Sequence, residues 1–250
     1  MLIDTHCHIN SLDNYTRNYL FERVNKNYLF IDISIDYKSA LSSFSLSQQF
    51  SFIYSSLGFH PLTEEPFSLS ILDNYKNLIV KSKKVIAIGE VGLDYKAKTS
   101  LDYQINILKN FILLAKEYSL PLIIHNRWDG YNIFKVLDDY YSNYESIIFH
   151  CFSQDKEFLE KVVSKKGTIS FSLNVLRRKK KLDEVLITVP CDNLLLETDS
   201  PYMKIDNHYS TPLDIEKVYS YTAEVKNLSI DDLCNIIVKN VKRIFRIDIL

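Results

Sequence analysis

The stretch LIDTHCHIN, residues 2–10, begins with a short apolar run and ends in two histidines separated by one residue. If Leu2–Thr5 is a strand, His6 and His8 point the same way, because alternate side chains of a strand lie on one face. The two imidazoles could then face one metal ion, or the alternation could be a coincidence. The residues that follow the other apolar runs of the chain distinguish these interpretations.

Seven more apolar runs, rich in β-branched or aromatic residues, follow the first. The eight predicted strands are Leu2–Thr5, Tyr28–Ile35, Phe52–Leu57, Val85–Ile88, Leu120–Ile124, Ser146–Phe149, Thr168–Phe171 and Asn193–Leu196. Between them lie segments with helical spacing, of which Asp102–Tyr118 is the clearest. Apolar strands that alternate with helices are typical of a parallel sheet covered by helices. Eight such units match a (β/α)₈ TIM barrel, although a doubly wound open sheet would give a similar pattern.

Nothing in the sequence divides the chain into domains. It contains no low-complexity segment, Pro/Gly-rich linker or internal repeat, and the residues suited to chemistry extend from His6 to Asp199. We therefore expect residues 1–250 to form a single TIM-barrel domain. Beyond the eighth strand, Pro212–Glu224 and Ile230–Phe245 are predicted to be two closing helices.

Composition excludes several classes of protein. The 30 Lys and Arg residues nearly balance the 31 Asp and Glu residues, so no overall basic field attracts nucleic acid. The four cysteines form no CxxC pair, which argues against a disulfide framework. Cys7 and Cys151 alternate with histidines, so we expect their side chains to face the helix layer. No apolar run approaches the ~20 residues of a spanning helix, and no signal peptide is recognisable. We expect a cytoplasmic protein without a membrane partner or an obligate protein partner.

Histidines and carboxylates follow six of the eight predicted strands. They are His6 and His8, His60, Glu90, His125, His150, and Asp199. In a parallel barrel the carboxyl ends of the strands form one rim, where active sites are built. A single histidine at a strand end is more often a structural residue, but equivalent placement at several strands favours a metal site.

The types of ligand indicate two divalent ions. Histidine and carboxylate suit Zn²⁺, Mn²⁺ or Fe, and sites dominated by carboxylate and water suit Mg²⁺. The set exceeds what one tetrahedral ion needs and suits two ions with open water positions. Glu90 could bridge the ions, and Asp199 could orient an acidified water and take its proton. Asp4 lies deeper in its strand, and we expect it to be a buried supporting residue.

Other residues of the predicted rim are candidates for substrate binding. His60 could contact a phosphate oxygen or protonate a leaving alkoxide, or it could only orient its loop. Arg127 could clamp a phosphate with two hydrogen bonds, or pair with a structural carboxylate. The basic run at residues 177–181 could guide a nucleic acid, or it could be a solvated helix start. Five aromatic residues could stack on bases or simply pack: Phe59, Tyr95, Trp128, Phe152 and Tyr202.

Taken together, the motifs resemble the TatD family of metal-dependent deoxyribonucleases in the amidohydrolase superfamily. The matching stretches are IDTHCHIN (3–10), GFHP (58–61), AIGEVGLDY (87–95), LPLIIHNR (120–127), FHCFS (149–153) and LLLETDSPY (194–202). The resemblance implies a distorted (β/α)₈ barrel with a binuclear divalent-metal site. It also implies the ligand sets: one ion on His6, His8 and Asp199, the other on His125 and His150, and Glu90 as the bridge.

The resemblance further implies hydrolysis of phosphodiester bonds in DNA, commonly from the 3′ end and often with Mg²⁺. We therefore expect a TatD-like deoxyribonuclease, exonucleolytic on single-stranded or frayed DNA, with two Mg²⁺ or Mn²⁺ ions, or Zn²⁺ instead. The alternatives are hydrolysis of a small-molecule amide, ester or lactone, and a catalytically weak metal-binding protein that acts through partners. Three stretches depart from the family: Trp128 separates Arg127 from the acidic Asp129, Gln154 replaces a glycine, and residues 203–212 replace a basic loop. None of these departures removes a predicted ligand.

Overall fold

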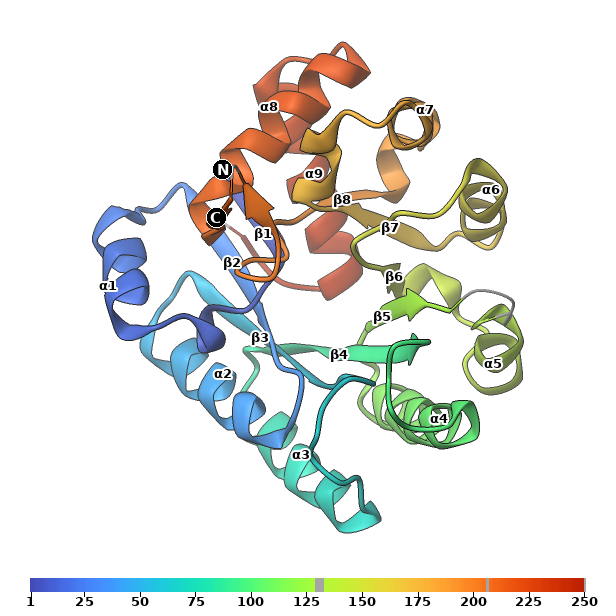
Figure 1. The fold of residues 1–250 in the computed structure, drawn as a ribbon. Helices are drawn as coiled ribbons and strands as arrows, with labels where there is room; N and C mark the ends of the chain where they lie inside the picture. The colour runs from blue at the N-terminus through green and yellow to red at the C-terminus, as the bar shows by residue number, and fades with distance from the viewer. Residues whose placement is uncertain (129–132, 206, 250) are drawn as a thin grey trace.

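Eight parallel strands form a nearly closed barrel in the computed structural model, which describes residues 1–128, 133–205 and 207–249 (Figure 1). The strands are β1 (Leu2–Cys7), β2 (Tyr28–Ile33), β3 (Ile53–Phe59), β4 (Val85–Asp94), β5 (Leu122–Arg127), β6 (Ile147–Phe149), β7 (Thr168–Phe171) and β8 (Leu194–Leu196). Each strand pairs with the next one in chain order, which confirms the predicted barrel. This order excludes the doubly wound sheet, in which the strand order reverses at a switch point.

Helices surround the barrel, most of them between successive strands and the last two after β8 (Figure 1). They are α1 (Asn14–Arg23), α2 (Tyr37–Gln49), α3 (Leu69–Lys81), α4 (Leu101–Tyr118), α5 (Ile133–Tyr140), α6 (Lys156–Ser164), α7 (Lys180–Thr188), α8 (Ile215–Lys226) and α9 (Ile230–Phe245). In α4 the buried residues Leu108, Phe111 and Ile112 recur at helical spacing, and Ser100 caps the helix by accepting a hydrogen bond from Tyr103 N. No helix of the described ranges is long and apolar enough to cross a membrane.

Short elements complete the chain. They are the 3-10 turns η1 (Ile9–Ser11), η2 (Tyr144–Ser146), η3 (Leu173–Arg177), η4 (Cys191–Asn193) and η5 (Pro212–Asp214), and a hairpin of β9 (Lys204–Ile205) and β10 (His208–Tyr209). The first predicted closing helix, Pro212–Glu224, therefore begins with a separate 3-10 turn, and its α-helical part runs to Lys226. The second, Ile230–Phe245, has the predicted bounds.

Hydrogen bonds join β1 to the segment after β8, where the barrel closes, and they also position residues of the candidate site. The Asp4 carboxylate accepts hydrogen bonds from Thr198 N at 3.0 Å and Thr198 Oγ1 at 2.6 Å. One residue further along, Asp199 N donates to the His6 carbonyl at 2.9 Å. The end of β1 and the segment after β8 are therefore held side by side.

Strand β4 is longer than the sequence predicts, and it carries Glu90 in its interior. All ten residues of β4, Val85–Asp94, are buried, whereas the predicted strand ends at Ile88. Two glycines allow its neighbours to approach: a Cβ on Gly58 would collide with the backbone of Glu90, and a Cβ on Gly92 would collide with the backbone of His125. Close packing on both sides therefore fixes the position of Glu90.

Candidate metal centre

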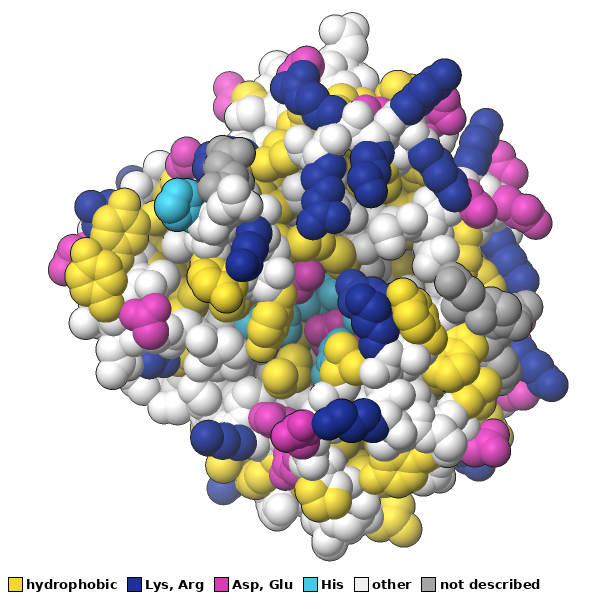
Figure 2. All heavy atoms as spheres, in the orientation of Figure 1, with side chains coloured by type: hydrophobic (Ala, Val, Ile, Leu, Met, Phe, Trp, Pro, Cys, Tyr) yellow, Lys and Arg dark blue, Asp and Glu magenta, His cyan; other side chains and the backbone are white. Residues whose placement is uncertain are grey.

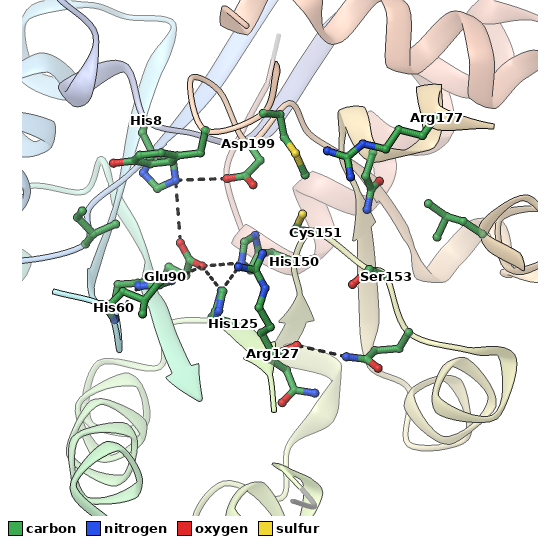
Figure 3. Close-up of a pocket in the computed structure, with 18 of the residues that line it drawn as sticks. His8, His60, Glu90, His125, Arg127, His150, Cys151, Ser153, Arg177 and Asp199 are labelled. Atoms are coloured by element: carbon green, nitrogen blue, oxygen red, sulfur yellow. Dashed lines mark hydrogen bonds and ion pairs between the residues drawn. The ribbon is translucent and has the colours of Figure 1, made fainter. Parts of the chain in front are cut away.

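Glu90 lies at the centre of a group of histidines at the carboxyl end of the barrel (Figure 3). Its Oε1 atom lies 2.7 Å from His125 Nδ1, 2.6 Å from His150 Nε2 and 3.3 Å from His60 Nε2. Its Oε2 atom lies 3.4 Å from His6 Nε2. One buried carboxylate therefore faces ring nitrogens that come from the ends of four strands.

Asp199 and His8 complete the group on the Oε2 side of Glu90. Asp199 Oδ1 lies 3.6 Å from His8 Nε2 and 3.9 Å from His6 Nε2. His8 Nε2 lies 4.0 Å from Glu90 Oε2, and its Nδ1 atom lies 3.0 Å from the Ile33 carbonyl oxygen. The structure thus brings together all six residues that the sequence predicts as metal ligands.

Three sets of donor atoms are close enough to share a cation, with separations within 4.8 Å. The sets are His6, His8 and Asp199; His6, Glu90 and His150; and His60, Glu90 and His125. Both ring nitrogens of His6 are buried and have no hydrogen-bond partner among the described residues. An unpaired polar atom in the interior is costly, and a cation beside Nε2 would satisfy it. Imidazole nitrogens and carboxylate oxygens together suit divalent metals, so the cluster can bind a metal.

The two carboxylates of the cluster are held in their charged form. Burial alone would raise the pKa of Glu90, but His150 and His60 outweigh it and hold that pKa well below its ordinary value. Burial also opposes ionisation of Asp199, and the adjacent His8 and His6 nevertheless lower its pKa. Both side chains are therefore available as anionic donors at neutral pH.

Two further buried carboxylates lie behind the histidines that face Glu90 Oε1. Asp94 Oδ2 lies 2.9 Å from His125 Nε2, and Glu197 Oε1 lies 3.4 Å from His150 Nδ1. Glu197 is held by its own hydrogen bonds, which include one at 2.7 Å from Cys151 N. Each of these two histidines therefore has a carboxylate beside each ring nitrogen.

Neither Asp94 nor Glu197 is predicted from the sequence to be a site residue, although their spacing from predicted ligands is a usable signal. Asp94 follows Glu90 by four positions, so the two share a face of an extended strand. Glu197 precedes Asp199 by two positions. The expectation for Asp4 agrees with its position, because it is fully buried and accepts a hydrogen bond from His6 N at 3.2 Å.

The expectation that both cysteines near the histidines face the helix layer is wrong for one of them. Cys7 is fully buried and packs with Leu20 of α1 and Leu46 of α2. Cys151 instead lines the cavity above the cluster of candidate metal ligands. Strand β6 ends at Phe149, and Cys151 has a φ of 45°, so the alternation of an extended strand no longer applies there.

The cluster forms the floor of a cavity of about 650 Å³ (Figures 2 and 3). Four basic side chains line its wall: Arg127, Arg177, Lys179 and Lys181. The basic run is therefore divided, because Arg178 faces away and its guanidinium carbon lies 5.0 Å from the centre of the Tyr221 ring. Arg127 is about half exposed, and its Nη1 atom lies 3.8 Å from Asp94 Oδ2.

Other predicted rim residues occupy different environments. Phe59 and Phe152 are each 2% exposed and belong to the core, so base stacking is not available to them. Tyr202 is 54% exposed, lines the cavity and packs edge-on against His8. Gln154 also lines the cavity, and its Nε2 atom donates to the Asn126 carbonyl at 3.3 Å. Asp129 lies outside the described residues.

Comparison with known proteins places the chain among metal-dependent hydrolases. A model of the family described as TatD related DNase matches residues 3–246. The uncharacterized metal-dependent hydrolase YabD of Bacillus subtilis (strain 168) is 30% identical over 259 residues, covering 99% of this chain and 100% of that one. The 3′-5′ ssDNA/RNA exonuclease TatD of Pantoea vagans (strain C9-1) is 27% identical over 206 residues, 78% of this chain and 79% of that one. The crystal structure of YJJV, a TatD homolog from Escherichia coli K12, superposes with a TM-score of 0.89 at 23% identity, covering 99% of this chain and 98% of that one.

Proposed function

The chain belongs to the TatD-related DNase family of metal-dependent hydrolases, and we propose that it hydrolyses phosphodiester bonds of DNA. One observation carries this proposal: Arg127, Arg177, Lys179 and Lys181 line the same cavity whose floor is the metal-binding cluster. Phosphodiesters are anionic, and a chain with nearly balanced charges needs positive potential only beside its site. The name of the Pantoea vagans relative, which acts on single-stranded DNA and RNA, supports a nucleic-acid substrate.

We propose that two divalent ions bind, Mg²⁺ or Mn²⁺, with Zn²⁺ as the other candidate. His6, His8 and Asp199 would hold the first ion, and His125 and His150 the second. Glu90 would serve as a shared ligand of both ions. Ions held there would polarise the phosphoryl group and lower the pKa of a bound water.

The protein side chains would supply proton transfer and orientation. Asp199 is held in its ionised form, so it can orient the attacking water and accept its proton. His60 Nδ1 accepts a hydrogen bond from Leu62 N at 3.0 Å, which places the proton of the neutral ring on Nε2, the atom that faces the cluster. That proton is available to a phosphate oxygen or to the leaving alkoxide. Arg127 presents a guanidinium fork to the cavity, and such a fork can bind a phosphate with two hydrogen bonds.

The depth of the cluster supports action on single strands or frayed ends. His6 and His8 are each 1% exposed and Glu90 is 3% exposed, so a phosphate must enter the cavity to reach them. Duplex DNA is stiff over ~150 base pairs, whereas an unpaired end bends freely. We therefore propose exonucleolytic cleavage of unpaired ends.

The test is digestion of end-labelled single-stranded DNA by the wild type and by Glu90→Ala, each with Mg²⁺, with Mn²⁺ or with a chelator. We expect shortening only with the wild type plus metal, and at least a 10²-fold lower rate for the variant, since Glu90 faces both ligand groups. A blunt duplex of the same sequence is the matched substrate, and it should be cut more slowly.

Equal activity in both proteins would show that this cluster is not the site of cleavage. If neither protein cut DNA while the wild type hydrolysed a small ester or lactone in a Glu90-dependent manner, the substrate proposal would be replaced by a small-molecule hydrolase.

A further inference from the structure

We propose that Asp94 and Glu197 are positioning residues for the second ion, the one assigned to His125 and His150. This proposal rests on the two-ion function proposed above and adds that these two carboxylates support one of the two ions and not the other. Losing either carboxylate would weaken the second ion selectively and leave the first ion in place.

The two ion positions differ in what lies behind their histidines. Behind the second position, Asp94 lies 2.9 Å from His125 Nε2 and Glu197 lies 3.4 Å from His150 Nδ1. Behind the first position, the hydrogen-bond partner that the described residues give His8 Nδ1 is the neutral Ile33 carbonyl, at 3.0 Å. Among the described residues neither His6 Nδ1 nor His150 Nδ1 has a hydrogen-bond partner, and what distinguishes His150 Nδ1 is the Glu197 carboxylate oxygen at 3.4 Å.

A carboxylate behind a histidine acts on its metal-binding nitrogen. It holds the proton on the far nitrogen, so the near nitrogen offers its lone pair, and it fixes the direction of that lone pair. Here the near nitrogens are His125 Nδ1 and His150 Nε2, which both face Glu90 Oε1. The two rings use different nitrogens, so each needs its own partner to select the tautomer.

The carboxylates behind His125 and His150 compensate for a direct carboxylate ligand that the second position lacks among the described residues. The first position has its own carboxylate, Asp199, in addition to Glu90, whose Oε2 atom lies 3.4 Å from His6 Nε2. Among the described residues, the second position shares Glu90 and has no such carboxylate of its own. Asp94 and Glu197 are both fully buried, and a carboxylate is placed in the interior at a large cost unless it has a charged or strongly donating partner. Because they lie behind the two imidazoles, Asp94 and Glu197 supply negative charge to the second position through the histidine rings and not by direct contact with the ion.

The test measures metal stoichiometry and does not depend on nuclease activity. Wild type, Asp94→Asn, Asp94→Ala and Glu197→Gln are dialysed against Mn²⁺ at a concentration that saturates the wild type, and bound metal is counted. We expect two ions in the wild type and one in the variants, with the second affinity reduced about 10–100-fold. Asp94→Asn keeps an oxygen that can accept from His125 Nε2, so it should lose less affinity than Asp94→Ala.

Electron paramagnetic resonance of bound Mn²⁺ gives an independent readout. Two ions that share Glu90 should be magnetically coupled, and the variants should show the spectrum of a single uncoupled ion. Asp32→Asn is the matched control, because Asp32 is an equally buried carboxylate on strand β2 and its side chain accepts hydrogen bonds from Asn10 and not from a ring nitrogen of the cluster. Circular dichroism checks that each variant is folded, and Glu197→Gln repeats the test on the other histidine.

Two ions with unchanged affinities in folded Asp94→Ala and Glu197→Gln would overturn the inference and leave the proposed nuclease function intact. A wild type that binds a single ion would overturn the inference together with the two-ion part of the proposed function. Whether the chain cuts DNA is decided separately, by the digestion of end-labelled strands.

Discussion

At the scale of single residues, the site concentrates negative charge where water is excluded. Neighbouring histidines outweigh burial and keep the pKa of Glu90, Asp94 and Asp199 below ordinary values. The same contacts act on the histidines: burial alone would lower the pKa of His125, but Asp94 and Glu90 raise it. Without metal, protons on His125 and His150, whose pKa values are both raised, therefore balance the carboxylates, and a bound cation would displace those protons.

The pKa of Asp32 is shifted in the opposite direction, so the contribution of Asp32 to stability should depend on pH. Burial raises the pKa of Asp32 from 3.8 to about 6. Between these values the folded chain keeps a proton that the unfolded chain has lost, so this group lowers the free energy of unfolding as the pH rises. Two pKa units correspond to roughly 3 kcal/mol, an upper limit for one residue.

Asp32→Asn cannot ionise, so its free energy of unfolding relative to the wild type should improve by up to roughly 3 kcal/mol between pH 4 and pH 7. Urea unfolding of both proteins in a chelator at the two pH values measures this difference. The same relative stability at both values would contradict the assignment.

At the scale of elements, the sequence predicts which strands exist and which residues lie at their ends. Each of the eight predicted apolar runs became a strand, because a strand buried on both faces needs a continuous apolar run. The exact ends were less predictable. Glycines on and beside β4 let it continue to Asp94, and a turn with positive φ at Cys151 redirects the chain after β6. Both features arise from tertiary packing, which is why the extension of β4 to Asp94 was not predicted and the predicted orientation of Cys151 was wrong.

The segment from η3 into α7 divides the basic run between the cavity and the outer surface. Arg177, Lys179 and Lys181 line the cavity, whereas Arg178 contacts Tyr221, and Lys180 is not among the lining residues. If the lining charges attract DNA, replacing these three by Gln should weaken binding of single-stranded DNA. The plot of log affinity against log salt concentration should also become less steep, with the magnitude of its slope smaller by about 2, at ~0.7 for each lost phosphate contact.

Arg178→Gln with Lys180→Gln is the matched control, since it removes neighbouring charges that do not line the cavity. Binding is measured in a chelator by fluorescence anisotropy across a salt series. An unchanged slope in the triple variant, or an equal change in the control, would show that the run is only a solvated helix start.

At the scale of the whole molecule, the cluster joins parts of the barrel that are distant along the chain. Its residues come from β1, β4, β5, the ends of β3 and β6, and the segment after β8, and that segment is bonded to β1 across the seam. Opening the barrel anywhere between these elements would separate ligands. Metal binding should therefore stabilise the folded chain as a unit.

A cation that binds only the folded chain raises its free energy of unfolding by about 2.7 kcal/mol at 100 times its Kd. For a chain of 250 residues this corresponds to an increase of roughly 5–10 °C in the melting temperature for each ion. The increase in melting temperature should be larger at pH 8 than at pH 6, because protons compete with the cation for the histidines. His150 contributes most to this competition, since burial opposes its protonation but Glu90 and Glu197 raise its pKa well above the ordinary value. Differential scanning calorimetry with Mn²⁺ and with a chelator measures both effects. Glu90→Ala should lose most of this increase in melting temperature. If the melting temperature of the wild type were the same with and without Mn²⁺, a metal at the cluster would not stabilise the barrel.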